Sequence, residues 1–349
     1  MEQKISQIFQ NCKSQCVLFT NIKEIFYLTD AEFDGFWLLL VKDKIYSICS
    51  KMIEHQLREF FKNRNINICV GEPFYKTITE ILKQNNVNNV LIDTKYIDVA
   101  NFILLSEKLN QEKINIVKKA GILDNIRITK NKDEIIKLKK SCKIVSEVCN
   151  TIKGELKPGV SELDIHYRVL ELFAKNHVVE SFNPIIASGE NSANPHHISS
   201  LRKITTNDIV MMDIGCVYKG YCSDLTRTYF LGRIDDDKKK IWDVVKNAQN
   251  AVIKGIRAGL PIAWADKTAR NIIKESGYED KFIHATGHGI GIEIHEMPSL
   301  ASNAEGIFLT RMAVTVEPGI YIEQNFGVRI EDTILIKEND CEVLTSAVY

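Results

Sequence analysis

Residues 209–230 have the sequence IVMMDIGCVYKGYCSDLTRTYF, in which two apolar runs flank a short polar turn that contains glycine. This pattern is typical of an antiparallel β-hairpin. A turn centred on Tyr218 and Lys219 would place Asp213 directly opposite Asp224, with about 5 Å between their Cβ atoms. Two carboxylates at that separation repel each other unless a proton or a cation lies between them. For either aspartate alone, a position at the end of a strand is the simpler explanation.

A second hairpin of the same kind is predicted near the end of the chain. Its strands are residues 314–322 (VTVEPGIYI) and 327–336 (GVRIEDTILI), joined by a turn around Gln324. Pairing about that turn places Glu317 opposite Glu331, within otherwise apolar strands. Two hairpins that each hold an acidic pair are poorly explained as solvated surface. A dinuclear metal site accounts for both pairs.

Histidine is concentrated in the stretch before the second hairpin, residues 284–295 (HATGHGIGIEIH). His284 and His288 have the i, i+4 spacing of a helical zinc pair, but each glycine in the segment would cost such a helix about 1 kcal/mol. The dinucleotide-binding glycine pattern also fails, because position 292 is isoleucine. We therefore expect a glycine-rich loop that leads into a strand and presents His288 and His295 to a cleft. A single histidine is more often structural, but three within twelve residues favour a functional cluster.

One imidazole and four carboxylates form an oxygen-rich set of candidate ligands. Such a set suits Mn²⁺, Co²⁺, Fe²⁺ or Zn²⁺ in a two-metal hydrolase better than it suits a thiolate zinc site. Cys216 and Cys222 lie in the first hairpin, and we interpret them as small packing residues. The nine cysteines are scattered, with no Cys-x-x-Cys pair, which disfavours a disulfide framework or a structural zinc site.

Length and composition indicate the number of domains and argue against two classes of partner. The chain has 349 residues, enough for about two domains of ~150 residues each. Its 45 basic and 45 acidic residues give a net charge of zero, so nothing favours binding to nucleic acid or to a membrane. The polar N-terminus is unlike a signal peptide, and the longest apolar run, residues 36–41, is far shorter than a membrane span of ~20 residues. We therefore expect a soluble, reduced, cytoplasmic protein.

The pattern of apolar residues changes near residue 125. Before that point short apolar runs alternate with amphipathic segments, which predicts a small α/β domain. The predicted strands are residues 36–41, 45–48, 67–70 and 89–92, and the predicted helices are residues 53–61, 75–83 and 98–108. After it, the predicted helices are residues 133–153 with a solvated lysine face, one capped by Ser161, one over 237–257 and one from Trp264 to before Gly277.

Five short motifs follow one another in the second part of the chain. They are MDIG at residues 212–215, SDLTRT at 223–228, GHGIG at 287–291, VEPG at 316–319 and VRIED at 328–332, and IASGEN at 186–191 and Pro195-His196 accompany them. Together they resemble the signature of the pita-bread metallopeptidases, which include methionyl aminopeptidases, aminopeptidase P and prolidase. The first 125 residues resemble the N-terminal domain of the proline-specific members, through Asn21-Ile22 and the Tyr27-Leu-Thr segment.

The resemblance implies a fold and a domain division. An α/β N-terminal domain of the creatinase/prolidase type is expected over residues 1–127, with a role in dimerisation and substrate gating. An α+β pita-bread catalytic domain is expected over residues 128–349. The family also implies a homodimer.

The resemblance further implies roles for individual residues. The metal ligands are matched by Asp213, Asp224, His288, Glu317 and Glu331, with Asp224 and Glu331 engaging both cations. The histidines that contact the substrate and stabilise the tetrahedral intermediate are matched by His196 and His295. Glu317 has a further role in proton transfer.

The substrate pocket is matched less directly. His284 and Tyr321 match positions near it, and Phe182, Ile290 and Tyr321 are candidate wall residues. Arg329 is expected to orient a ligand carboxylate or the substrate, and a salt bridge of purely structural value is an equal alternative.

The activity implied is hydrolysis of Xaa-Pro bonds at the N-terminus of dipeptides or short proline-containing peptides. Two divalent cations would be required, with Mn²⁺ as the leading candidate and Co²⁺, Zn²⁺ or Fe²⁺ as alternatives, and hydroxide activated by metal would attack the scissile carbonyl. The Xaa-Pro nitrogen carries no N–H, so an apolar slot must recognise the proline ring. Some prolidases follow the His-Glu-x-Pro segment with an arginine suited to a dipeptide carboxylate. Here that position is Ser299, so the peptide length stays open.

Three other functions stay open. Methionyl aminopeptidases typically resemble only the second domain, so the presence of the first domain disfavours that activity. Creatinase-like hydrolases of non-peptide C–N bonds usually lack the metal residues, which are all present here. An inactive pita-bread module that acts as a binding scaffold would not require His196 and His295 alongside a complete ligand set.

Overall fold

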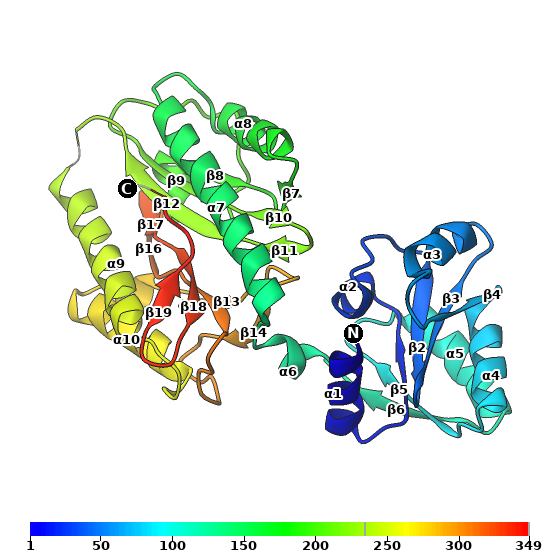
Figure 1. Cartoon of the computed structure of the whole chain (residues 1–349). Coiled ribbons are helices and arrows are strands. Elements are labelled where there is room, and N and C mark those ends of the chain that lie inside the picture. The colour runs from blue at the N-terminus through cyan, green and yellow to red at the C-terminus, as the bar shows by residue number, and fades with distance from the viewer. Residues whose placement is uncertain (234, 348–349) are drawn as a thin grey trace. The chain divides into compact units, whose positions relative to one another are not determined.

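The structure, a computed structural model of the chain, describes residues 1–233 and 235–347 (Figure 1). It divides into two compact units, Met1–Ile126 and Arg127–Tyr349. Each unit has its own β-structure and its own hydrophobic core. Among the described residues, no helix combines the length and the hydrophobicity needed to cross a membrane.

The N-terminal unit is built on a mixed sheet with strand order β4-β3-β2-β1-β5-β6. Its strands are β1 (Cys16–Phe19), β2 (Phe36–Val41), β3 (Lys44–Cys49), β4 (Asn67–Val70), β5 (Asn89–Asp93) and β6 (Asn115–Lys119). Its helices are α1 (Glu2–Cys12), α2 (Ile22–Thr29), α3 (Glu54–Phe61), α4 (Phe74–Gln84) and α5 (Val99–Gln111), and α6 (Asp124–Arg127) follows them. The strands and helices predicted for this region are therefore confirmed, with small shifts at their ends.

The core of the N-terminal unit explains why these segments form. The strand residues Leu39 and Ile92 are buried on the face of the sheet that packs against Ile78 and Leu82 of α4 and Leu105 of α5. In α4 the buried residues recur at helical spacing, so one stripe of the helix is apolar and the rest is polar.

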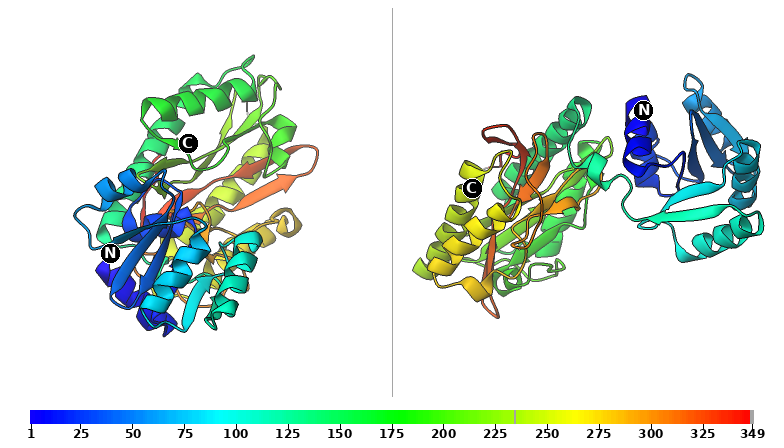
Figure 2. Two further views of the ribbon diagram at one scale, coloured as in Figure 1. Left: turned by 90° about the vertical axis from the view of Figure 1, so that its right-hand side faces the viewer. Right: turned by 90° about the horizontal axis from the view of Figure 1, so that it is seen from below.

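The first two helices of the second unit begin at side-chain caps. Asn131 caps α7 (Lys132–Glu155) in a capping box, in which Asn131 Oδ1 accepts the N–H of Glu134 at 3.0 Å and Glu134 Oε2 accepts the N–H of Asn131 at 2.9 Å. Ser161 caps α8 (Glu162–Lys175), as predicted. The other two predicted helices are α9 (Asp236–Gly255) and α10 (Ala263–Glu275), which pack side by side (Figure 2).

The strands of the second unit lie between the pair α7–α8 and the pair α9–α10 (Figure 1). One sheet has the order β12-β9-β8, a longer one has the order β14-β13-β15-β18-β19, and shorter ladders join β11-β10-β7 and β16-β17. The first strands are β7 (Val179–Glu180), β8 (Ile185–Ser188), β9 (Ile209–Ile214), β10 (Cys216–Tyr218), β11 (Tyr221–Cys222) and β12 (Leu225–Phe230). The later strands are β13 (His288–Gly289), β14 (Glu296–Ser299), β15 (Ala313–Val316), β16 (Gly319–Ile322), β17 (Phe326–Arg329), β18 (Asp332–Ile336) and β19 (Cys341–Val343). The short 3₁₀ helices are η1 (Gly189–Ala193) and η2 (Glu279–Lys281).

The first predicted hairpin exists, but its predicted register is wrong. Tyr218 pairs with Tyr221, and Asp213 pairs with Thr226 rather than with Asp224. The turn is therefore Lys219–Gly220, where both residues have positive φ (46° and 76°), as in the two-residue turns whose twist suits a hairpin. The shift makes Asp213 and Asp224 diagonal neighbours instead of a direct pair.

The second hairpin has the predicted register. Val316 pairs with Asp332 in the β15–β18 ladder, and Gly319 pairs with Arg329 in the β16–β17 ladder. The same register runs through both ladders, so Glu317 and Glu331 face each other across the break between them. Gln324 has a positive φ of 58°, which marks the predicted turn.

Candidate metal centre

Three side chains from separate segments converge in the interior of the second unit. Asp224 precedes β12, His288 begins β13 and Glu331 precedes β18. One candidate ligand atom from each lies within 4.8 Å of those of the other two. These residues are buried or nearly so, and they come from the two hairpins and the glycine-rich loop that the sequence singled out.

Asp213 and Glu317 adjoin this group. His288 Nε2 lies 3.3 Å from Glu317 Oε1 and 3.6 Å from Asp224 Oδ2. The charge of Asp213 acts on the pKa of Asp224, Glu317 and Glu331. The structure thus brings together the five side chains that the sequence proposed as metal ligands.

The protonation of His288 follows from its hydrogen bond. Its Nδ1 lies 3.0 Å from the carbonyl oxygen of Gly289, which can only accept, so Nδ1 carries the hydrogen. Burial lowers the pKa of His288, so the ring is neutral near neutral pH and Nε2 presents a lone pair. That lone pair faces two carboxyl groups, an arrangement that is repulsive unless a proton or a cation lies between them.

Several carboxylate oxygens in the cluster also lack a hydrogen-bonding partner in the described part of the chain. Asp213 Oδ1, Asp224 Oδ1 and Glu331 Oε1 are buried and have no hydrogen-bond partner among the described residues. A buried acceptor without a partner costs about 1–3 kcal/mol, and more when it is charged. The opposite oxygens of two of these groups are held by protein, since Thr226 Oγ1 donates to Glu331 Oε2 at 2.7 Å and Arg329 Nη2 donates to Asp213 Oδ2 at 2.5 Å. The donor set therefore fits divalent cations.

The pKa values of the carboxyl groups also fit a cation-binding site. Burial raises the pKa of Asp224 and Glu331 well above the ordinary range, and repulsion from neighbouring carboxylates raises it further. Burial also raises the pKa of Glu317 to about 7, despite the opposing effect of the Arg329 guanidinium. A divalent cation would reverse these shifts by favouring the ionised carboxylates.

Arg329 acts on the ligand group. It is buried, its Nη2 binds Asp213, its Nη1 donates to the Tyr321 hydroxyl at 2.8 Å and its Nε donates to Thr226 Oγ1 at 3.2 Å. The ion pair with Asp213 is compatible with both alternatives for this residue, orientation of a ligand carboxylate and a structural salt bridge.

His284 and Tyr321 form a pair beside the centre. The His284 Nε2 lies 2.9 Å from the Tyr321 hydroxyl, and its Nδ1 lies 2.8 Å from the Ala285 carbonyl oxygen. Burial lowers the pKa of His284 to about 4 and raises that of Tyr321 to about 12, so both are neutral near neutral pH. Nδ1 of His284 therefore donates, and Nε2 accepts from the tyrosine.

The remaining predicted residues differ in exposure. His295 packs edge-on against His288, with 4.4 Å between the ring centroids. His196 is exposed, and a positive charge on it would lower the pKa of both His284 and His295. Phe182 is half-buried, with its ring over Gly215, whereas Ile290 is completely buried.

Sequence reasoning missed the hydroxyl groups that hold the carboxylates. Thr226 holds Glu331, and Thr315 Oγ1 donates to Glu317 Oε1 at 3.0 Å. Thr315 could have been suspected, because it lies two residues before Glu317 on the same face of the strand. Sterics explain why residue 287 of the glycine-rich loop is glycine, since a Cβ there would lie 2.1 Å from the Thr315 carbonyl oxygen.

The fold and the site together define a two-unit protein with a buried centre of one histidine and four carboxylates, an arrangement suited to a two-metal hydrolase. The chain belongs to metallopeptidase family M24, whose model matches residues 136–338. Residues 3–129 match the creatinase/prolidase N-terminal domain. The predicted fold, an α/β N-terminal domain followed by a pita-bread catalytic domain, is confirmed.

Relatives of known name resemble the chain over most of its length. An Xaa-Pro dipeptidase of Pyrococcus furiosus is 37% identical over 272 residues, which cover 78% of this chain and 77% of that protein. The solved structure of an Xaa-Pro dipeptidase from Bacillus anthracis has a TM-score of 0.94 and 32% identity, covering 99% of this chain and 98% of that one. That of an X-Pro aminopeptidase from Thermotoga maritima has a TM-score of 0.89 and 25% identity, covering 98% of each chain.

Proposed function

We propose that the protein hydrolyses Xaa-Pro bonds at the N-terminus of dipeptides and short peptides, with two divalent cations as cofactors. The observation that carries the proposal is the neutral His288, whose Nε2 faces two carboxylates in a cluster with unpartnered buried oxygens. The preference for proline is supported by the relatives, which are named Xaa-Pro dipeptidase and X-Pro aminopeptidase.

In this proposal the cations are held by Asp213, Asp224, His288, Glu317 and Glu331. When bound, they would lower the pKa of a coordinated water and polarise the scissile carbonyl. Thr226 and Arg329 hold one oxygen each of Glu331 and Asp213, which leaves the other oxygen of each carboxylate for a cation.

The remaining roles concern proton transfer and substrate binding. Glu317 is proposed to move a proton from the attacking water to the leaving nitrogen. His196 and His295 are proposed to donate hydrogen bonds to the carbonyl oxygen as negative charge develops on it. His284, Tyr321 and Phe182 are proposed to line the proline side of the pocket, where recognition must rely on ring shape because the nitrogen has no N–H.

The residue after the His-Glu-x-Pro segment, Ser299, bears on the length of the peptide substrates that the site accepts. Ser299 pairs with His288 in the β13–β14 ladder, so a side chain at this position belongs to the strand next to the centre. Serine offers no cation for the carboxylate of a dipeptide. We therefore propose that longer Xaa-Pro peptides are accepted alongside dipeptides.

Three further features complete the proposal. Mn²⁺ is proposed as the native metal, because the ligand set is rich in oxygen. The N-terminal domain is proposed to act in homodimerisation and substrate gating. A reducing, cytoplasmic location is proposed because no disulfide links the cysteines, which all lie in the described part of the chain.

One assay tests the proposal directly. Protein supplemented with Mn²⁺ is incubated with Ala-Pro, Ala-Pro-Ala and Met-Ala-Ser, with and without a chelator. We expect cleavage of the first two, its loss on chelation and its return when Mn²⁺ is restored. Full activity in the chelator would contradict the metal assignment.

The substrate pattern separates the alternatives. Cleavage of Ala-Pro alone would indicate a strict dipeptidase, and cleavage of Met-Ala-Ser alone would indicate removal of methionine. Cleavage of none would favour a creatinase-like hydrolase or an inactive scaffold.

A further inference from the structure

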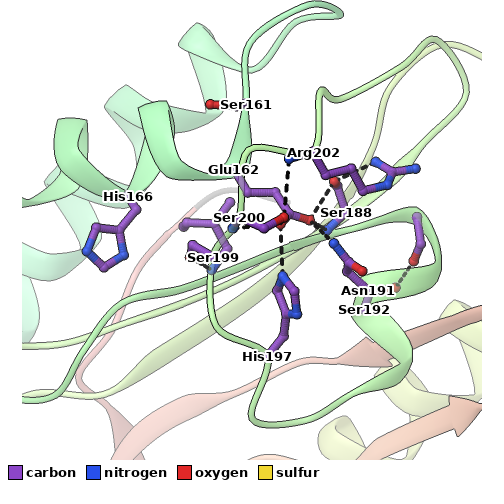
Figure 3. Close-up of polar contacts among 12 residues, drawn as sticks. Ser161, Glu162, His166, Ser188, Asn191, Ser192, His197, Ser199, Ser200 and Arg202 are labelled. Carbon is purple, nitrogen blue, oxygen red and sulfur yellow. Dashed lines mark hydrogen bonds and ion pairs between the residues drawn. The ribbon is translucent and has the colours of Figure 1, made fainter.

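A buried carboxylate outside the metal centre lies at the first residue of α8 (Figure 3). Glu162 is completely buried. Its Oε1 accepts hydrogen bonds from the backbone N–H and the hydroxyl of Ser188, both at 2.7 Å, and from the amide of Asn191 at 2.9 Å. Its Oε2 accepts from His197 Nε2 at 2.8 Å and from the backbone N–H and hydroxyl of Ser200 at 3.1 and 2.7 Å. All of these donors belong to one stretch of chain.

Backbone hydrogen bonds also connect this stretch of chain to the start of α8. The N–H of Glu162 donates to the Arg202 carbonyl at 3.1 Å, and the N–H of Leu163 donates to the Ser200 carbonyl at 2.9 Å. Arg202 Nη1 in turn donates to the Ser188 hydroxyl at 2.6 Å, which joins the two ends. Residues 188–202, called the anchored segment below, are therefore tied to the start of α8 at both of their ends.

Glu162 remains charged in this buried place. Burial raises the pKa of its carboxyl group, but the hydrogen bonds from Asn191, His197, Ser188 and Ser200 outweigh burial and hold that pKa below the ordinary range. Hydrogen bonds to an ionised acceptor are roughly twice as strong as neutral ones. The helix N-terminus also favours a negative charge at this position. The carboxylate is thus a strong point of attachment for the anchored segment.

The other side of the anchored segment faces the metal centre. The carbonyl oxygen of Pro195 accepts a hydrogen bond from Arg329 Nη1 at 3.3 Å, and the Ser192 hydroxyl accepts the N–H of Gly327 at 2.9 Å. Arg329 is the residue that binds Asp213. His196, directly after Pro195, is close enough for its charge to act on His284 and His295.

The adjacent histidines His196 and His197 therefore have different surroundings. His197 is hydrogen-bonded to Glu162, whereas His196 is exposed beside the centre. We propose that Glu162 is a positioning residue, which fixes residues 188–202 so that His196 is held beside the metal centre. The catalytic part of this inference rests on the proposed function, and the positional part rests on the contacts alone.

The test compares Glu162→Gln with a control in the same helical turn. The glutamine keeps the shape but places an N–H₂ group where one oxygen accepted hydrogen bonds. Asp164→Asn is the control, because Asp164 is an acid at the start of α8 whose contacts are to Ser161 and Lys203, outside the anchored segment. Asn191→Ala removes one donor from the segment side and serves if Glu162→Gln does not fold.

The first measurement is hydrogen exchange, which does not depend on activity. We expect Glu162→Gln to lose protection of backbone amides in residues 188–202, while Asp164→Asn keeps it. Unchanged protection in Glu162→Gln, or an equal loss in Asp164→Asn, would overturn the proposal. Hydrogen exchange tests the positional part of the proposal even if the wild-type protein cleaves no Xaa-Pro peptide. A failure of the proposed function is therefore recognised separately.

The second measurement is a double-mutant cycle with His196→Ala. We expect Glu162→Gln to lower kcat/KM about 10- to 100-fold at unchanged metal content. In the His196→Ala background the same change should lower it less than about threefold, because Glu162 acts through His196. An equal effect in both backgrounds, or a loss of metal, would show that Glu162 does not act by positioning His196.

Discussion

At the scale of single residues, the centre depends on one imidazole. His288 donates through Nδ1 to its neighbour's carbonyl, which leaves Nε2 as an acceptor among carboxylates that are acceptors too. Such a site must take up protons or a cation, and a divalent cation can satisfy several of its acceptors at once. Metal binding is therefore the property that substitutions here should change first.

Replacement of a candidate ligand tests this directly. Asp224→Asn keeps the volume and removes a charge from the centre, and we expect both metal content and kcat/KM to fall, the latter at least about 100-fold. Glu323→Gln changes an exposed acid near the turn of the second hairpin and should leave both unchanged. Elemental analysis and the Ala-Pro assay provide the readouts, and an active, metal-loaded Asp224→Asn protein would contradict the site.

Thr226 offers a finer test of the groups that hold the ligands. Thr226→Val keeps the shape but leaves Glu331 Oε2 and Arg329 Nε without this partner. We expect a stability loss of about 1–3 kcal/mol and a metal affinity about 10- to 100-fold lower. Thr226→Ser restores the hydroxyl and should bind metal nearly as the wild type does. Metal titration of the two variants separates the hydroxyl from the side-chain volume.

The residues that the sequence could predict share one property, which is repetition of a local pattern. Two similar hairpins each contain an acidic pair within apolar strands, Asp213 with Asp224 and Glu317 with Glu331. Because the pattern occurs twice, a common function is easier to recognise. Glu162 has no such signal, because a glutamate after a capping serine looks like an ordinary helix start. Its partners lie 26 to 38 residues away in the chain, and only the folded structure brings them together.

At the scale of elements, the two hairpins show when register can be predicted. In the second hairpin the acidic pair and the turn at Gln324 agree, and the predicted pairing holds. In the first, two candidate turns lie one residue apart, and the choice depends on which residues adopt positive φ. Lys219 and Gly220 do so, and glycine in the second place favours that turn.

Glycine replacements test this turn against a matched site. Gly220→Ala adds a Cβ at φ 76°, where we expect a loss of about 1 kcal/mol in unfolding free energy. Gly154→Ala lies in α7, where nothing is within 4 Å of the added Cβ, and should stabilise the protein by about 0.5–1 kcal/mol. Urea unfolding of both variants gives the comparison. A stabilising Gly220→Ala would contradict the assigned turn.

At the scale of the whole molecule, a chain of zero net charge gathers four acids in one buried place. Asp213 and Asp224 come from the half of the second unit covered by α7 and α8, and His288, Glu317 and Glu331 come from the half covered by α9 and α10. The centre thus links the two halves. A ligand that binds only the folded state stabilises it, so bound metal should raise the stability of the whole unit.

The pH dependence of stability should reveal this link. Burial raises the pKa of Glu317 to about 7 from an ordinary value of 4.5, so without metal the folded chain holds a proton that the unfolded chain releases. The contribution of Glu317 to the stability of metal-depleted protein should therefore fall as the pH rises from 4.5 to about 7, and the raised pKa values of Asp224 and Glu331 act in the same direction. The lowered pKa values of the buried histidines His284 and His288 act in the opposite direction, so the contribution of Glu317 is measured by comparison with a variant that lacks it. Urea unfolding at several pH values, with and without Mn²⁺, measures the difference.

Two controls make the pH experiment specific. Glu317→Gln removes one of the titrating carboxyl groups, so as the pH rises the metal-depleted wild type should lose stability relative to this variant. Bound Mn²⁺ keeps the carboxylates ionised and should remove the fall in stability as the pH rises. Identical pH dependences of metal-depleted wild type and Glu317→Gln would contradict the raised pKa of Glu317.

The order of the centre's residues along the chain has a consequence for synthesis. A ribosome makes both aspartates first, then the histidine, and Glu331 only after the rest. The nascent polypeptide therefore carries an incomplete cation site through most of the translation of its second unit. A complete set of five candidate ligands exists only once Glu331 has been made, so the fully formed site can bind cations only after the second hairpin has been synthesised.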